Sequence, residues 1–260
     1  MTQRHWLASY GSIPHDINAD AYCSVVDLAD QAMKRPAHRP AMRCAGPTLS
    51  HADLDRLSRD FAAYLQGPLG VKKGDRIAVM MPNLLAFPIA FLGIARAGAV
   101  QVNVNPLYTP RELEHQLNDA GVQTIVVYGG VSAMVAEVMS RTGLKTVVTV
   151  GVGDGSGKVL PSPPVDARLK GATAFTDALA QGAPLSFTPV DLKGDDLVFL
   201  QYTGGTTGLS KGAALSHRNL IANTEQFKAF MPEALRPGEE VIVTAIPLYH
   251  IFALMVNFIT

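Results

Sequence analysis

The chain has 260 residues, of which 48% are hydrophobic and 17% charged, and 22 basic residues balance 22 acidic ones. This composition is typical of a globular protein and excludes a disordered chain. The basic residues are scattered rather than clustered, so the charge pattern gives no indication of a nucleic-acid partner.

The termini and cysteines indicate a cytoplasmic protein. The first residues lack the apolar core of a signal peptide. The longest apolar tract, residues 84–104, is interrupted by polar residues and by Pro88 and Gly93, which predicts a core helix and strand rather than a membrane span. Cys23 and Cys44 fit no metal-binding spacing, and we expect two buried thiols in a reducing compartment, with a disulfide as the alternative.

The first predicted elements are a hairpin and a helix. Residues 41–49 predict a hairpin that turns at Gly46 and Pro47. Ser50 then begins a helix whose apolar residues recur on one face. Asn83 is expected to cap the later helix that follows it.

From Arg76 onward, strands and helices alternate. The pattern predicts strands at 76–81, 100–104, 122–128 and 146–150, with helices at 84–97, up to Gly121, and near 131–140. The second helix begins with a capping box, Thr109-Pro-Arg-Glu112, with proline at its first position. This alternation predicts right-handed βαβ units and an α/β fold with parallel or mixed sheets flanked by helices.

The second half of the chain predicts a division into two parts. Residues 151–165 are rich in glycine, proline and serine, which indicates a surface excursion or a linker. We expect a first α/β subdomain over 1–190 and the start of a second over 191–260.

The C-terminal residues 252–260 form an apolar run without the glycine, proline or basic residues that usually end a helix. We therefore expect a fragment cut inside a larger domain. Residues 254–259 should then expose an apolar surface that favours self-association.

The segment from Tyr202 to Gly212 reads Y-T-G-G-T-T-G-L-S-K-G. Its glycines let backbone N–H groups turn toward an anion, its threonines add hydroxyl donors, and Lys211 adds a positive charge. Such an array suits a polyphosphate, although it is not a Walker A loop because Gly208 and Lys211 are not adjacent. An apolar run before it and a helical pattern from His217 predict that it joins two strands. A plain glycine hairpin is the alternative.

This segment resembles the phosphate loop of the adenylate-forming superfamily, which includes acyl-CoA synthetases, peptide-synthetase adenylation domains and luciferases. Two longer stretches, residues 103–121 and 244–254, resemble the bacterial long-chain fatty-acid–CoA ligases. The likeness covers nearly the whole chain and weakens between about residues 131 and 188. It implies the N-terminal portion of the superfamily's large domain, because complete members are about twice as long.

The resemblance implies that the enzyme joins a fatty acid to AMP and then transfers the acyl group to coenzyme A. The implied substrates are a long-chain fatty acid, ATP with Mg²⁺, and coenzyme A. The magnesium-holding glutamate of the family is expected beyond residue 260, so we assign no metal ligand here. By itself the chain should make no acyl-CoA. Peripheral association with the inner face of the membrane and a homodimer are left open.

The residues implied to bind the nucleotide phosphates are Tyr202, Thr203, Gly204, Gly205, Thr206, Thr207, Gly208, Leu209, Ser210, Lys211 and Gly212. Lys211 and His250 are the expected catalytic residues. His250 would lie beside the acyl carboxylate and the α-phosphate, and donate a hydrogen bond to the developing adenylate. Together with His250, the residues Phe252, Ala253 and Leu254 would bind the acyl group at the mouth of its tunnel.

Structural roles compete with each of these assignments. Lys211 could be a solvent-facing lysine at a strand start, His250 a capping residue, and residues 252–254 ordinary core. Two other functions also compete, namely an adenylating enzyme for a different acid and a non-enzymatic nucleotide-binding module. An enzyme for amino acids usually carries an acidic residue where this chain has Leu248 and Tyr249, which favours an acid with a neutral tail.

Overall fold

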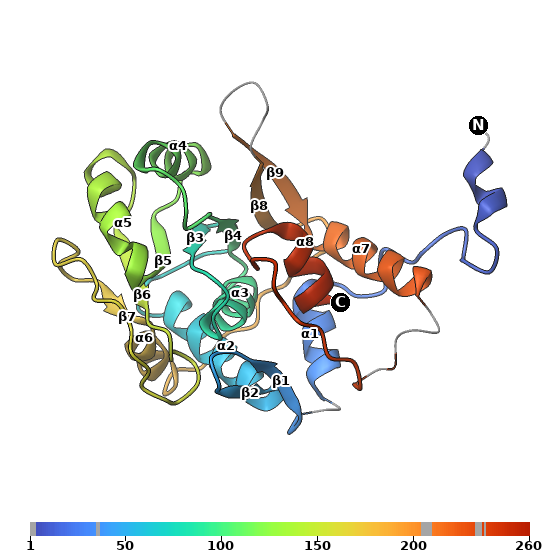
Figure 1. Cartoon of the computed structure of the whole chain (residues 1–260), viewed down its shortest axis with the longest axis horizontal. Helices are drawn as coiled ribbons and strands as arrows, with labels where there is room; N and C mark the ends of the chain where they lie inside the picture. The colour runs from blue at the N-terminus through green and yellow to red at the C-terminus, as the bar shows by residue number, and fades with distance from the viewer. Residues whose placement is uncertain (1–3, 35–36, 204–209, 232–235, 237) are drawn as a thin grey trace.

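The computed structural model describes residues 4–34, 37–203, 210–231, 236 and 238–260. At its centre lies a seven-stranded sheet in the order β7-β6-β5-β3-β4-β8-β9 (Figure 1). The strands are β3 (Arg76–Met80), β4 (Val100–Asn103), β5 (Thr124–Tyr128), β6 (Thr146–Val150), β7 (Thr173–Ala174), β8 (Leu197–Thr203) and β9 (Lys211–Ser216). Neighbouring strands are parallel except β8 and β9. The predicted α/β fold with a mixed sheet is confirmed.

Helices cover both faces of this sheet. The helices are α1 (Val25–Lys34), α2 (His51–Gln66), α3 (Ala86–Arg96), α4 (Pro110–Ala120), α5 (Ser132–Val138), α6 (Phe175–Gly182), α7 (His217–Phe230) and the short α8 (Ile251–Ala253). One apolar cluster joins α4 and α5 to one face, and a larger one joins α2, α3, α6 and α7 to the other. Coverage on both sides explains why the central strands are buried and mostly apolar.

Local signals in the sequence mark the starts of three helices. Capping boxes at Ser50, Thr109 and Ser216 begin α2, α4 and α7, and Gly121 ends α4 in the left-handed region at φ +64°. Asn83 was expected to cap α3, and that prediction is wrong. The N-cap of α3 is Leu85, without a side-chain bond, because Asn83 contacts a distant segment instead.

Outside the main sheet, β1 (Pro40–Arg43) and β2 (Thr48–Ser50) form the predicted hairpin. Residues 151–165 contain no helix or strand. The expectation of two buried thiols is wrong. Both cysteines are free, but Cys23 is exposed and Cys44 is only partly buried, because Cys23 lies in a bend before α1 and Cys44 in the loop of the hairpin.

The C-terminal segment packs against the body of the protein, contrary to the expected exposed surface. A π-helical turn, Leu254–Ile259, buries Leu254, Met255 and Ile259. Phe258 lies edge-on to Phe91 of α3, with ring centroids 5.6 Å apart. Among the described residues, no helix combines the length and apolar character that crossing a membrane requires.

Candidate active site

The predicted phosphate segment begins in β8 and ends in β9, the antiparallel pair at one edge of the sheet (Figure 1). Thr203 ends β8 and pairs with Lys211, which begins β9 and is exposed. The two residues therefore stand opposite each other where the segment leaves and rejoins the sheet, as the sequence predicts. Six of its predicted phosphate-binding residues, Gly204–Leu209, lie outside the described residues, so their contacts remain predictions.

Tyr202 and Gly212 form the cross-strand pair next to Thr203 and Lys211. A Cβ atom at Gly212 would lie 2.9 Å from Cε2 of the Tyr202 ring, so only glycine leaves room for the ring. The Tyr202 hydroxyl donates a hydrogen bond to Asp119 of α4. Burial raises the pKa of the Tyr202 hydroxyl, and the bond to Asp119 raises it further. Tyr202 is thus a neutral anchor of the hairpin.

His250 sits in a turn that begins at Pro247, whose carbonyl accepts the His250 N–H at 2.9 Å. The imidazole Nδ1 accepts the backbone N–H of Phe252 at 3.3 Å. In the neutral imidazole the proton is therefore on Nε2, since a nitrogen that accepts a bond carries no proton. His250 caps α8 and at the same time presents Nε2–H as a donor, so the structural and functional roles of this exposed residue are compatible.

Asn83 holds the segment that leads to His250. Its amide nitrogen donates to the carbonyl oxygens of Thr244 and Ile246, both at 3.1 Å. Its amide oxygen accepts the Leu248 N–H at 2.7 Å. Sequence reasoning missed this role because the partners lie more than 160 residues away along the chain.

A buried polar chain joins the two predicted site segments. Gln201 of β8 donates to the Tyr249 carbonyl at 3.3 Å and accepts a bond from Asn103 of β4 at 2.9 Å. Gln101 donates to Asn103 at 2.7 Å. The turn before His250 is therefore tied to the residue that precedes Tyr202. No local pattern signals this chain, although three amides in otherwise apolar strands are unusual and could have drawn attention to it.

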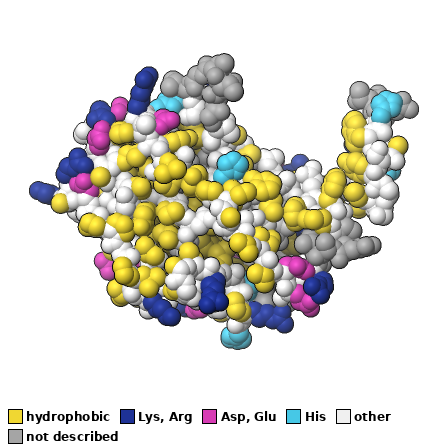
Figure 2. All heavy atoms as spheres, viewed as in Figure 1, with side chains coloured by type: hydrophobic (Ala, Val, Ile, Leu, Met, Phe, Trp, Pro, Cys, Tyr) yellow, Lys and Arg dark blue, Asp and Glu magenta, His cyan; other side chains and the backbone are white. Residues whose placement is uncertain are grey.

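The three residues predicted, together with His250, to bind the acyl group differ in their exposure to solvent. Ala253 and Leu254 are fully buried in the core, whereas Phe252 is 53% exposed. Phe252 lines an apolar groove of about 580 Å³ between α7 and the C-terminal segment. The apolar lining of the groove includes Leu215, Leu220, Phe227, Phe230, Phe252 and Met255, and Asn219, Asn223 and Gln226 of α7 also line it. Figure 2 shows hydrophobic side chains spread across the middle of the face on which α8 lies in Figure 1.

The remaining polar groups near the site include a buried histidine with a structural role. His217 is buried, and its Nδ1 accepts the Val25 N–H at 3.2 Å. Burial lowers the pKa of His217 to about 4, so it is a neutral link between α1 and α7. Within the described ranges, no three His, Cys, Asp or Glu side chains converge to hold a metal ion.

The family follows from comparison with known proteins. The model of the AMP-binding enzyme family matches residues 28–260. The chain belongs to this family. It is 46% identical to a long-chain-fatty-acid–CoA ligase of Escherichia coli O6:H1, over 97% of this chain and 47% of that protein. A long-chain-fatty-acid–CoA ligase of Bacillus subtilis is 32% identical over the same shares. The chain thus spans about half the length of these AMP-binding relatives.

Solved structures of similar proteins confirm the fold. A long-chain-fatty-acid–CoA ligase from Archaeoglobus fulgidus matches 91% of this chain and 45% of its own, with a TM-score of 0.74 and 25% identity. The apo structure of Mycobacterium smegmatis MbtA matches 98% of this chain and 43% of its own, with a TM-score of 0.75 and 22% identity. The predicted likeness to the N-terminal part of adenylate-forming enzymes is confirmed.

Proposed function

We propose that this chain forms the phosphate-binding half of an ATP-dependent long-chain fatty-acid–CoA ligase. The observation that carries the proposal is the 46% identity to such a ligase over 97% of the chain. The geometry supports it, because a hydrogen bond between Gln201 and Tyr249, which are 48 residues apart in the sequence, ties the phosphate segment to the His250 turn.

The first step joins the fatty-acid carboxylate to the α-phosphorus of ATP and releases pyrophosphate. Both reactants are anions, so the site must offset negative charge on the five-coordinate phosphorus and on the leaving group. Lys211 begins β9 opposite Thr203, and we expect its ammonium group to contact phosphates bound by the residues that precede it. Its charge would stabilise the departing pyrophosphate.

His250 would act as a hydrogen-bond donor rather than a base, because the carboxylate is already ionised at neutral pH. Its Nδ1 is occupied by the Phe252 N–H, which leaves Nε2–H to donate to an oxygen of the forming adenylate. The apolar groove beside Phe252 offers a surface for a neutral hydrocarbon tail.

Family membership implies the use of ATP, and Mg²⁺ would enter bound to the triphosphate. The glutamate that the family resemblance implies as its protein ligand is expected beyond residue 260. In the second step the thiol of coenzyme A would attack the acyl carbon and release AMP.

The test is adenylate formation by the complete product of the gene that encodes this chain. Purified protein is mixed with MgATP and a panel of acids, and pyrophosphate release and acyl-adenylate are measured before coenzyme A is added. We expect long-chain fatty acids to give adenylate and, with coenzyme A, the thioester. The 260-residue chain alone, run in parallel, should give no thioester.

The same panel decides between the competing functions. A requirement for aromatic or amino acids would indicate an adenylating enzyme for a different acid. ATP binding without adenylate formation for any acid would indicate a nucleotide-binding module. Either result would overturn the proposed fatty-acid specificity.

A further inference from the structure

Helix α4 contacts both ends of the predicted phosphate segment, residues 202–212. At the first end, the Tyr202 hydroxyl donates to the Asp119 carboxylate. At the second end, His115 Nε2 lies 3.1 Å from the carbonyl oxygen of Ser210. A carbonyl oxygen can only accept, so Nε2 is the protonated nitrogen. His115 and Asp119 are four residues apart and therefore lie on the same face of the helix.

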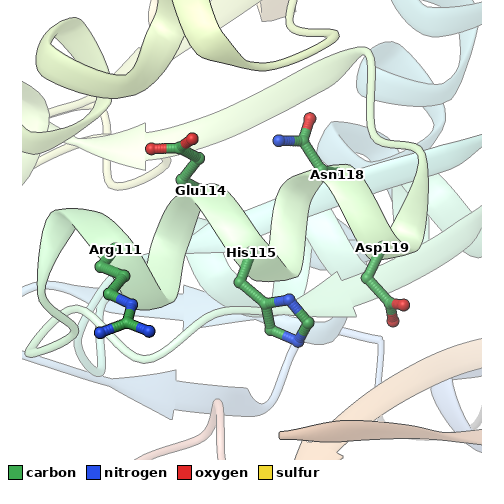
Figure 3. A pocket seen from close by; sticks show the side chains of 5 residues that line it. All are labelled: Arg111, Glu114, His115, Asn118 and Asp119. Atoms are coloured by element: carbon green, nitrogen blue, oxygen red, sulfur yellow. The ribbon is translucent and has the colours of Figure 1, made fainter. Parts of the chain in front are cut away.

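Apart from the capping Glu112 and the buried Gln116, the polar side chains of α4 form two rows that face different neighbours. Figure 3 shows Arg111, His115 and Asp119 on the side of the helix where the β8–β9 hairpin lies, with Glu114 and Asn118 on the other side. Glu114 accepts a bond from the Arg141 side chain at 2.7 Å, and Asn118 donates to the Arg141 carbonyl at 3.0 Å. The second row thus holds the helix to the segment after α5, and the first row is directed at the hairpin.

The helix is itself firmly attached to the sheet. Leu113 and Leu117 are fully buried. Gln116 donates to the Asn103 carbonyl at the end of β4 at 2.7 Å, and Arg76 of β3 donates to the Ala120 carbonyl at 2.7 Å. Because α4 is attached to β3 and β4, its contacts with the β8–β9 hairpin also hold the hairpin in place relative to these central strands.

The hairpin needs such support because β9 is an edge strand whose first four residues are exposed. Donors that stabilise a transition state must be held in place before the reaction, and loosely supported donors lose much of their effect. We propose that His115 and Asp119 are positioning residues for phosphate binding, holding the two ends of the segment through Ser210 and Tyr202. This inference rests on the proposed function of the segment.

The hydrogen-bond chemistry suggests which substitutions preserve the contacts. His115→Gln keeps an N–H donor for the Ser210 carbonyl, whereas His115→Leu removes it. Asp119→Asn keeps a carbonyl oxygen for the tyrosine hydroxyl, whereas Asp119→Ala removes it. Glu114→Gln is the matched control, because it lies on the same helix but faces Arg141.

The first experiment measures hydrogen–deuterium exchange of the backbone amides of β8 and β9 in the 260-residue chain. We expect His115→Leu and Asp119→Ala to exchange about three- to tenfold faster at Thr203 and at Lys211 to Ala213, which corresponds to one lost hydrogen bond. His115→Gln, Asp119→Asn and the control should exchange as the unchanged chain does. Exchange in the disruptive variants that matches the control would overturn the inference.

The second experiment measures adenylate formation by the complete gene product while ATP and fatty acid are varied separately. We expect His115→Leu and Asp119→Ala to lower kcat/KM for ATP about tenfold, with KM for the fatty acid unchanged and partial rescue in His115→Gln and Asp119→Asn. An equal change in the parameters of both substrates would contradict a positioning role.

The two arms separate the failure of this inference from the failure of the proposed function. If the unchanged protein forms no adenylate, the proposed function fails, and the exchange measurement alone decides whether α4 holds the hairpin. If the unchanged protein is active but both disruptive variants behave as Glu114→Gln does, the positioning role fails and the function stands.

Discussion

Replacing Asn83 by aspartate tests whether this residue caps a helix or holds the His250 segment. Aspartate and asparagine are equally good N-caps, so a capping role predicts no effect. In the structure the amide nitrogen donates to the carbonyl oxygens of Thr244 and Ile246 at 3.1 Å. A carboxylate keeps the bond from the Leu248 N–H but loses both donors and turns a negative charge toward two carbonyl groups.

The size of the effect follows from these contacts. Each lost bond contributes about 1 kcal/mol, and the facing carbonyl groups add the cost of unsatisfied acceptors, so the segment should lose roughly 2–3 kcal/mol of local stability. Backbone amides within residues 244–250 should then exchange with solvent roughly 30- to 150-fold faster.

Hydrogen–deuterium exchange at neutral pH measures this directly. Asn105→Asp provides the control, because the Asn105 side chain accepts the Leu107 N–H, and a carboxylate keeps that bond. Equal exchange in Asn83→Asp and Asn105→Asp over residues 244–250 would refute the proposed attachment and return Asn83 to a local role.

Three further predictions concern single residues. In the complete gene product, Lys211→Ala should slow adenylate formation by about 10²–10³ without affecting the fold, and an unchanged pre-steady-state rate would make Lys211 an ordinary strand residue. Gly212→Ala should destabilise the protein by about 1–3 kcal/mol, because its Cβ would meet the Tyr202 ring; an unshifted denaturation midpoint would contradict this. The pKa of His217 is lowered from 6.5 to about 4, so protonation favours the unfolded state as the pH falls from 6.5 to 4, and stability should fall by up to about 3 kcal/mol. His217→Asn should weaken this dependence of the unfolding free energy on pH, which urea titrations at several pH values measure. An equal pH dependence in both proteins would show that His217 does not cause it.

The sequence predicts features that depend on neighbouring residues. The capping boxes at Ser50 and Thr109 act within one helical turn, and both begin helices as expected. The strands of the parallel sheet are also predictable, because burial on both faces makes them mostly apolar. By contrast, α6 follows Ala174, which makes no side-chain capping bond, so no capping residue marks its start.

The candidate site depends on contacts that sequence patterns do not reveal. The segment 202–212 and His250 are recognisable by composition and resemblance. Their attachment depends on Asn83, His115 and Asp119, whose partners lie far away in the chain. The same polar side chains would suit a helix cap or a solvated helix face, and only the tertiary structure decides between these roles.

Formation of an acyl-adenylate by the complete gene product tests the central claim most directly. Protein, MgATP and palmitate are mixed without coenzyme A, and pyrophosphate and palmitoyl-adenylate are measured in one turnover. The account predicts that both appear together in equal amounts, and that benzoate or an amino acid in place of palmitate gives neither. Pyrophosphate without palmitoyl-adenylate, or adenylate only with a charged or aromatic acid, would contradict it.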